Sequence, residues 1–153
     1  MSASARLTEL GITLPPVAAP LAAYVPALRV GDQVWTSGQL PMVAGVLSVT
    51  GKLGAEVDLD TGVAAARTCV LNALAAAASV AGGIDAITRI VKIVVFVASA
   101  PDFTAQPAVG NGASQLLGEI FGDAGVHVRS AVGVSVLPLD APVEVELVCD
   151  VRA

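Results

Sequence analysis

Residues 143–151 alternate between apolar and polar side chains. The odd positions are apolar, whereas Glu144 and Glu146 occupy even positions. This period of two predicts a strand with one buried face. Two more strands are expected upstream. Residues 86–99 are rich in β-branched side chains, which predicts a buried central strand, and residues 128–137 alternate again.

In two segments, one before residues 86–99 and one after them, the apolar residues recur with helical spacing. From Val63 to Ala81 they repeat every three or four positions, and two glycines then end the pattern. The spacing predicts a helix, with Asp60 or Thr61 as its candidate N-cap. Residues 103–122 show the same spacing followed by a glycine, which predicts a second helix.

The N-terminal part is less regular. Residues 1–22 are rich in Pro and Ala and are expected to form an irregular lead-in. Residues 27–38 predict two short strands around a hairpin turn, and residues 46–49 predict a further short strand. This order of elements predicts an α+β fold, with two helices packed on one face of a mixed sheet. We expect one domain over residues 1–153.

Composition adds an expectation about assembly. Hydrophobic residues make up 55% of the chain but aromatic residues only 3%, so the core must be aliphatic. Charged residues are 14%, against a usual level of about 25%. So few charges leave little polar surface, and apolar faces can be buried between subunits. The composition therefore predicts an oligomer.

The same features bear on location. No apolar run approaches the ~20 residues of a membrane-spanning helix, and the longest, residues 93–100, has strand length. No basic segment precedes an apolar one at the N-terminus, so no secretory signal is expected. Cys69 and Cys149 stand alone in apolar contexts and predict buried free thiols, which fits a cytoplasmic protein.

Charge and ligand counts argue against two kinds of partner. The net charge is −5, and the eight Lys and Arg residues are scattered. Nucleic-acid binding relies on clustered cations at phosphates, so nucleic acid is not an expected partner. With a single histidine and no cysteine cluster, we expect no zinc or other metal site.

The segment HVRSAVGVSVLP, residues 127–138, carries the most suggestive chemistry. Arg129, Ala131 and Gly133 share one face, and Ser130 with the following valines shares the other, which we interpret as a core face. Only small side chains flank the arginine, which leaves room beside its guanidinium for a small carboxylate. The alternative role for Arg129 is a structural ion pair with a Glu of a neighbouring strand.

Several segments, in this order, resemble the RidA/YjgF family. They are YVPALRVGDQVWTSGQLP, GKLG, AARTCVLNALA, VVFVAS followed by DF, VRSAVGVSVLP and VEVEL. Together they cover nearly the whole chain from Tyr24 to Arg152, and the collinear set is more specific than any single motif. The resemblance implies a chorismate-mutase-like α+β fold, a homotrimer and three pockets at the subunit interfaces.

The resemblance also implies the residues of a site. Arg129 matches the family arginine that binds the substrate carboxylate, and Glu144 matches the glutamate that holds the reactive water. Positions that line the same pocket are matched by Tyr24, Ser37, Gly38 and Asn111. Two plain alternatives stand beside these roles: Glu144 as a solvent-facing strand residue, and Tyr24 as a hydrophobic cap with its hydroxyl in solvent.

The activity that the resemblance implies is hydrolysis of reactive enamine or imine intermediates derived from amino acids. Such a 2-iminobutanoate/2-iminopropanoate-type deaminase releases a 2-oxo acid and ammonia and needs no cofactor. Many members carry a cysteine where this chain has Ala131, so a thiol-dependent activity is not expected and the chain resembles a divergent branch. His127 has no acid partner in the sequence and is left out of the site.

Two other functions stay open. A non-enzymatic binding or sensor protein for 2-oxo acids would use the same pocket. An endoribonuclease has less support, because RNA cleavage usually needs paired acid–base groups and phosphate-binding cations.

Overall fold

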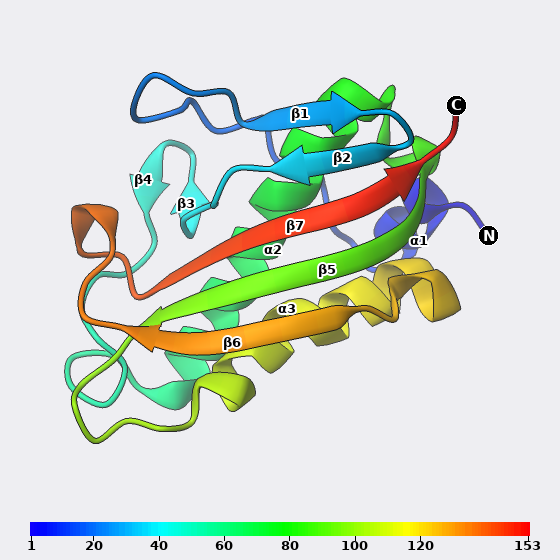
Figure 1. The fold of residues 1–153 in the computed structure, drawn as a ribbon. Coiled ribbons are helices and arrows are strands. Elements are labelled where there is room, and N and C mark those ends of the chain that lie inside the picture. The colour runs from blue at the N-terminus through cyan, green and yellow to red at the C-terminus, as the bar shows by residue number, and fades with distance from the viewer.

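Five strands form one mixed sheet, and helices cover only one of its faces (Figure 1). The computed structural model describes all 153 residues. The sheet order is β1-β2-β7-β5-β6, and β5 and β6 are its only parallel pair. The strands are β1 (Ala27–Val30), β2 (Gln33–Thr36), β5 (Ile87–Ala98), β6 (Val128–Val134) and β7 (Val143–Val151). The predicted α+β fold with a mixed sheet is confirmed.

The remaining elements lie around this sheet. The helices are α1 (Ala3–Glu9), α2 (Leu59–Ala81) and α3 (Gln106–Phe121). A separate hairpin pairs β3 (Met42–Val43) with β4 (Val46–Leu47), and single 3-10 turns form η1 (Ile84–Ala86), η2 (Gly122–Gly125) and η3 (Pro138–Asp140). In Figure 1 the helices lie behind the sheet, with α2 packed against β7 and α3.

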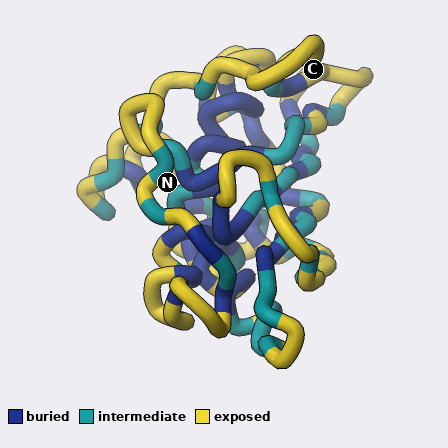
Figure 2. Tube along the Cα trace, turned by 90° about the vertical axis from the view of Figure 1, so that its left-hand side faces the viewer, coloured by how far each residue is buried: buried dark blue, intermediate teal, exposed yellow.

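The core lies between the sheet and α2. The odd-numbered side chains of β7 are all buried on this side, as the alternation predicted. In α2, the alanines Ala73 and 75–78 are buried as well. Because the alanine side chain is only a methyl group, the helix and the sheet can approach each other closely. The side chains between them are aliphatic. Figure 2 shows the buried part of the chain in the middle, with the exposed residues along the outer turns and loops.

Local signals set the ends of α2. Asp58 is the N-cap, and its Oδ1 accepts a hydrogen bond from the Thr61 N–H at 2.8 Å. The predicted cap at Asp60 or Thr61 was therefore wrong, because the earlier carboxylate already binds the free N–H of the first turn. The helix ends at Gly82, whose φ of +94° suits glycine far better than any other residue.

One segment does have the length of a membrane span. By length and composition α2 is apolar enough to cross a membrane, which corrects the prediction that no segment approaches this length. However, 61% of its most apolar window is buried inside the protein, where it forms the central helix of the core.

The lead-in that was expected to be irregular contains α1. Ser2 caps this helix by accepting from the Ala5 N–H, and the Asp85 carboxylate accepts from both the N–H and the hydroxyl of Ser4, at 2.8 and 2.6 Å. Leu7 is buried in the core. Because Asp85 is far away in the sequence, no local pattern could reveal this support.

The two faces of β6 are the reverse of the prediction. Arg129 aligns with Ile93 and Ala131 aligns with Val95, on the face that the helices cover. Val132 aligns with Phe96 on the open face and is exposed. The valine face is therefore not a core face. β6 lies at the sheet edge, and its small side chains, rather than its valines, face α3.

Candidate functional site

Arg129 lies against α3. Its Nη1 donates to Asn111 Oδ1 at 3.0 Å and to Ser114 Oγ at 3.1 Å, and its Nη2 donates to the Pro107 carbonyl at 3.2 Å. Gly110 permits this approach, because a Cβ at that position would lie only 3.1 Å from Nη1. The structure thus brings together two of the predicted site residues, Arg129 and Asn111.

No carboxylate neutralises Arg129. The ion pairs of the chain are Arg6–Glu9 and Arg67–Glu119, so Arg129 forms no ion pair within the chain. A guanidinium has five N–H donors, and three hydrogen bonds to neutral acceptors leave two donors free. An unpaired positive charge with two free donors is the arrangement that a carboxylate ligand needs.

The only histidine of the chain extends this group. Ser114 Oγ lies 2.9 Å from His127 Nε2, and His127 Nδ1 lies 2.6 Å from the Gly125 carbonyl oxygen. A carbonyl oxygen can only accept, so in the neutral histidine Nδ1 carries the proton and Nε2 accepts from the Ser114 hydroxyl. The lone pairs of that hydroxyl are then available to Arg129.

This link was missed in the sequence, where His127 was left out and Ser114 was not considered. Part of this arrangement could have been found in the sequence, because Asn111 and Ser114 are three residues apart on a helix and therefore share a face. We call Arg129, Asn111 and Ser114 the arginine half-site.

Glu144 lies on the other face of the sheet, where its carboxylate covers Gly38. A Cβ at residue 38 would overlap Glu144 Oε1, so this contact requires glycine. Burial raises the pKa of Glu144, and the negative charge of Glu146 raises it further. A half-buried carboxylate without a cationic partner holds a proton more readily than an exposed carboxylate does. We call Glu144 and Gly38 the glutamate half-site.

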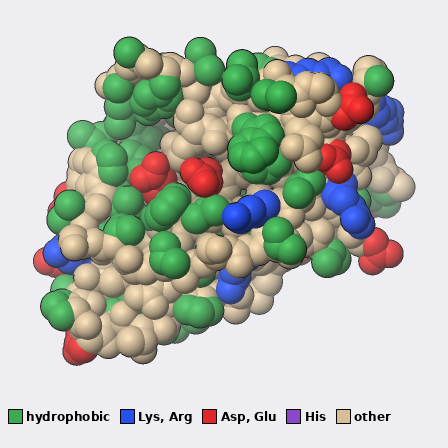
Figure 3. Space-filling view, viewed as in Figure 1, with side chains coloured by type: hydrophobic (Ala, Val, Ile, Leu, Met, Phe, Trp, Pro, Cys, Tyr) green, Lys and Arg blue, Asp and Glu red, His purple; other side chains and the backbone are tan.

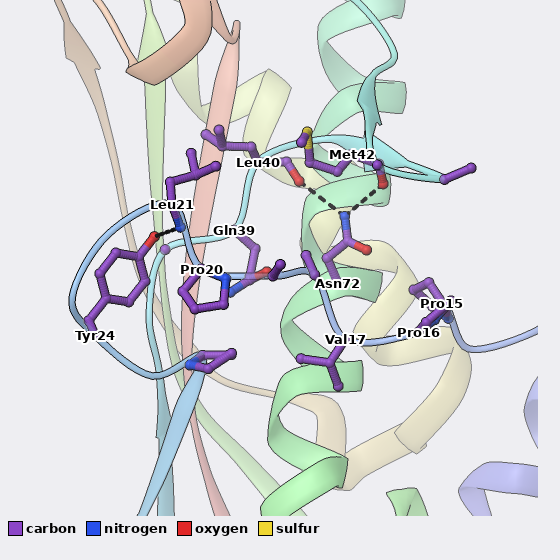
Figure 4. A pocket seen from close by; sticks show the side chains of 16 residues that line it. Pro15, Pro16, Val17, Pro20, Leu21, Tyr24, Gln39, Leu40, Met42 and Asn72 are labelled. Carbon is purple, nitrogen blue, oxygen red and sulfur yellow. Dashed lines mark hydrogen bonds between the residues drawn. The ribbon is translucent and has the colours of Figure 1, made fainter.

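Tyr24 and Ser37 lie at the chain segments that flank β1 and β2. Ser37 Oγ donates to the Val25 carbonyl at 2.6 Å, which ties the two segments together. Tyr24 is exposed, and its hydroxyl oxygen accepts a hydrogen bond from the Leu21 N–H at 3.3 Å. Figure 4 shows the tyrosine ring on the loop of the proline-rich segment, beside a cavity that Gly38 also lines.

Within one chain, the two half-sites do not meet. Arg129 aligns with Ile93, which is buried on the helix side, whereas Glu144 aligns with Phe96 on the open side. Alternate residues of a strand point to opposite faces of its sheet. The chain therefore presents the arginine half-site under α3 and the glutamate half-site on the uncovered face.

The uncovered face of the sheet is rich in apolar side chains. Leu28, Trp35 and Val148 form one row across β1, β2 and β7, and Phe96 and Val132 lie in another row. Trp35 is the only tryptophan and is 53% exposed. Figure 3 looks onto this face and shows hydrophobic side chains spread across it, with two acidic groups side by side.

Both cysteines are free and buried, as predicted. Burial raises the pKa of the Cys69 thiol well above its usual value, and burial raises that of Cys149 to about 12. Neither thiol therefore supplies a thiolate nucleophile near neutral pH.

Comparisons with known proteins agree with this architecture. Residues 4–151 match the family model described as "YjgF/chorismate mutase-like, putative endoribonuclease". Protein TCP17 of Trypanosoma cruzi is 44% identical over 152 residues, which cover 97% of this chain and 94% of that protein.

Solved structures give the same result. A protein of Shewanella oneidensis with the same endoribonuclease description is 36% identical, with a TM-score of 0.95 over 99% of this chain and 100% of its own. TdcF of Escherichia coli, solved with bound serine, is 27% identical, with a TM-score of 0.64 over 92% of this chain and 96% of its own. The chain is therefore a member of the RidA/YjgF family.

Proposed function

We propose that this protein hydrolyses reactive enamine or imine intermediates derived from amino acids, in pockets completed between copies of the chain. The observation that carries the proposal is the separation of the two half-sites. One chain holds Arg129 under α3 and Glu144 on the open face of the sheet. An assembly can bring the arginine half-site of one copy against the glutamate half-site of the next.

The arginine half-site accounts for substrate recognition. A 2-imino acid carries a carboxylate, and Arg129 offers it an unpaired charge and two N–H donors. Asn111 and Ser114 hold the guanidinium against α3, so little side-chain entropy is lost on binding. The serine bound to TdcF is also an amino-acid carboxylate, which supports this substrate class.

The glutamate half-site accounts for the chemistry. As the water oxygen adds to the imine carbon, Glu144 takes one proton from the water and passes it to the imine nitrogen, which gives a carbinolamine. Glu144 then takes the proton of the new hydroxyl group while the carbon–nitrogen bond breaks, and passes it to the nitrogen, which leaves as ammonia. The products are a 2-oxo acid and ammonia, and water is the only co-reactant. The raised pKa of Glu144 fits both proton transfers.

The assembly that we propose is a homotrimer. Its interfaces would cover the apolar rows around Trp35 and Val132, which one chain leaves exposed. Burying this face would also exclude water from the site and strengthen the electrostatic contacts of Arg129.

The test is an assay in which an amino-acid oxidase generates imines from several parent amino acids. The wild-type protein should accelerate release of the 2-oxo acid. Arg129→Ala should abolish the acceleration and weaken 2-oxo acid binding by roughly 1.5–3 kcal/mol, the usual worth of a hydrogen bond to a charged group. Arg129→Lys should rescue poorly, because lysine lacks the planar fork. Glu144→Gln should retain binding and lose turnover.

A matched control is available. Arg89→Ala removes an exposed arginine of β5 that belongs to neither half-site, and it should leave the activity unchanged. If the wild type binds 2-oxo acids but does not accelerate imine hydrolysis, the protein is a binding protein instead. Unchanged binding by Arg129→Ala would contradict the assigned site, and cleavage of single-stranded RNA would favour the endoribonuclease description.

A further inference from the structure

A cavity lies beneath the proline-rich segment 15–26, and Gly38 is the one half-site residue that lines it. This segment crosses α2 and the loop that follows β2, and it encloses about 400 Å³. That volume lies within the range of small-molecule sites. Sixteen residues line it and none is charged; apolar walls include Val17, Ala18, Leu40 and Met42. In Figure 4, Gln39 and Asn72 lie between this segment and the loop with Leu40 and Met42.

Asn72 places an unpaired acceptor in this cavity. It is only 3% exposed, and its Nδ2 donates to the carbonyl oxygens of Leu40 and Met42, both at 3.0 Å. Because carbonyl oxygens only accept, the amide nitrogen must face them, and the orientation of the side chain is fixed. Its Oδ1 therefore points away from that loop and accepts no hydrogen bond from the protein.

Gln39 places a second acceptor beside it. It is 6% exposed, and its Nε2 makes one long contact of 3.4 Å to the Ser37 carbonyl. Its Oε1 likewise accepts no hydrogen bond from the protein. Four of the lining residues are prolines, which have no N–H to offer these oxygens. Every side-chain oxygen that is closed off from solvent has a hydrogen-bond partner. Because these two amide oxygens have no partner, both reach open space.

We infer that this cavity binds a small uncharged molecule that has an apolar body and an N–H or O–H donor, such as a primary amide. The donor would satisfy the amide oxygens of Asn72 and Gln39, and the body would replace water along the apolar walls. A carboxylate is unsuited, because it offers only acceptors and would lose its hydration without a cation nearby. The inference does not rest on the proposed deaminase reaction, because it uses the amide oxygens of Asn72 and Gln39 and neither Arg129 nor Glu144.

Calorimetric titration of the full chain with three molecules of equal size tests the inference. Hexanamide has the apolar body and two N–H donors, 2-heptanone has the body without a donor, and hexanoate carries a charge. Each hydrogen bond to an amide oxygen should improve affinity about fivefold. Hexanamide should therefore bind at least tenfold more tightly than the other two.

Two variants locate the binding. Gln39→Met keeps the volume and removes one acceptor, so it should weaken hexanamide binding about fivefold and leave 2-heptanone unchanged. Ala18→Phe fills the cavity and should abolish binding of both. Ala23→Phe introduces the same ring in the same segment outside the cavity and is the matched control; circular dichroism verifies that each variant folds.

The other outcomes would overturn the inference. Absence of saturable hexanamide binding means that the cavity holds water only. Equal affinity for hexanamide and 2-heptanone would show that the amide oxygens of Asn72 and Gln39 do not contribute to binding. If Ala18→Phe still binds hexanamide, the amide binds outside this cavity. If Arg129→Ala abolishes hexanoate binding, hexanoate binds at the arginine half-site.

Discussion

Ser114 holds Arg129 through a hydroxyl whose proton is directed toward His127. The serine touches the guanidinium and not the reacting atoms, so it is a positioning residue. Without it, Nη1 loses an acceptor and the guanidinium gains freedom that substrate binding must remove.

Ser114→Ala should therefore raise KM for imine substrates two- to tenfold and leave kcat nearly unchanged, since the lost interaction serves ground and transition states alike. Ser114→Thr keeps the hydroxyl and should restore KM. Ser130→Ala, on the open face of the same strand as Arg129, is the control. An equal fall in kcat with unchanged KM would assign Ser114 a part in the chemistry instead.

Glu144 makes the stability of the folded chain dependent on pH. Burial disfavours its charged form in the folded state only, so the folded state binds the proton more tightly than the unfolded state. The contribution of Glu144 to the stability of the folded state is therefore greatest below its usual pKa of 4.5, and it falls as the pH rises through the raised pKa.

Glu144→Gln removes this titration. Urea unfolding should find the variant more stable than the wild type at pH 7, and the difference should shrink toward pH 4. A variant that is less stable at pH 7 would show that the charged carboxylate has a favourable partner in the folded protein.

At the scale of elements, α3 must lie close to α2 so that its other side can hold Arg129. Gly112 makes this contact possible, because a Cβ there would overlap the backbone carbonyl of Val63. Gly112→Ala should lower the free energy of unfolding by about 1–3 kcal/mol, as overpacking does, and should weaken ligand binding at Arg129.

A Cβ at Gly118 on the same helix would meet nothing within 4 Å, so this glycine is the matched control. Gly118→Ala should stabilise the protein by up to about 1 kcal/mol through helix propensity. If Gly112→Ala is equally stabilising in thermal unfolding, the close approach of the two helices does not limit the fold.

The long elements could be predicted because their signals are local. The alternation of 143–151 and the β-branched run before Ser99 match β7 and β5 closely. α1 was missed because its support comes from Asp85, in a distant turn. The faces of β6 were reversed because an edge strand with apolar residues on its open face looks like a core strand in sequence.

In the candidate site, too, some features had a local sequence signal and others did not. The motif around Arg129 indicated a carboxylate-binding role, but no spacing could show that Asn111 and Ser114 hold its guanidinium. The contact of Glu144 with Gly38 depends on the pairing of residues that follow β2 with β7, which are more than a hundred residues apart. Neither the cavity nor its amide oxygens at Gln39 and Asn72 had a sequence signal, since buried amides usually pair inside the protein.

For the whole molecule, the separation of the half-sites predicts complementation between inactive variants. When Arg129→Ala and Glu144→Gln chains are refolded together in equal amounts, some neighbours combine an intact arginine with an intact glutamate. Random pairing yields roughly a quarter of the wild-type sites, because each site takes one residue from each of two copies. The deaminase assay should show this recovery.

A mixture of Arg129→Ala with the double variant contains no intact pair and should stay inactive. Light scattering should give about three times the chain mass of 15.2 kDa for every sample. Failure of the first mixture to recover activity, although the trimers form, would mean that each site lies within one chain.

The position of β7 has a consequence for folding during synthesis of the protein. Its neighbours β2 and β5 are hydrogen-bonded to it and not to each other, although both precede it in the chain. During synthesis the sheet must therefore remain in two pieces until residues 143–151 have left the ribosome. The nascent chain meanwhile carries unpaired strand edges, which are sites of aggregation and of chaperone capture. A premature stop codon before Val143 would leave the three helices and Arg129 in the chain, yet only the separate pairs β1–β2 and β5–β6, without the strand that joins them into one sheet.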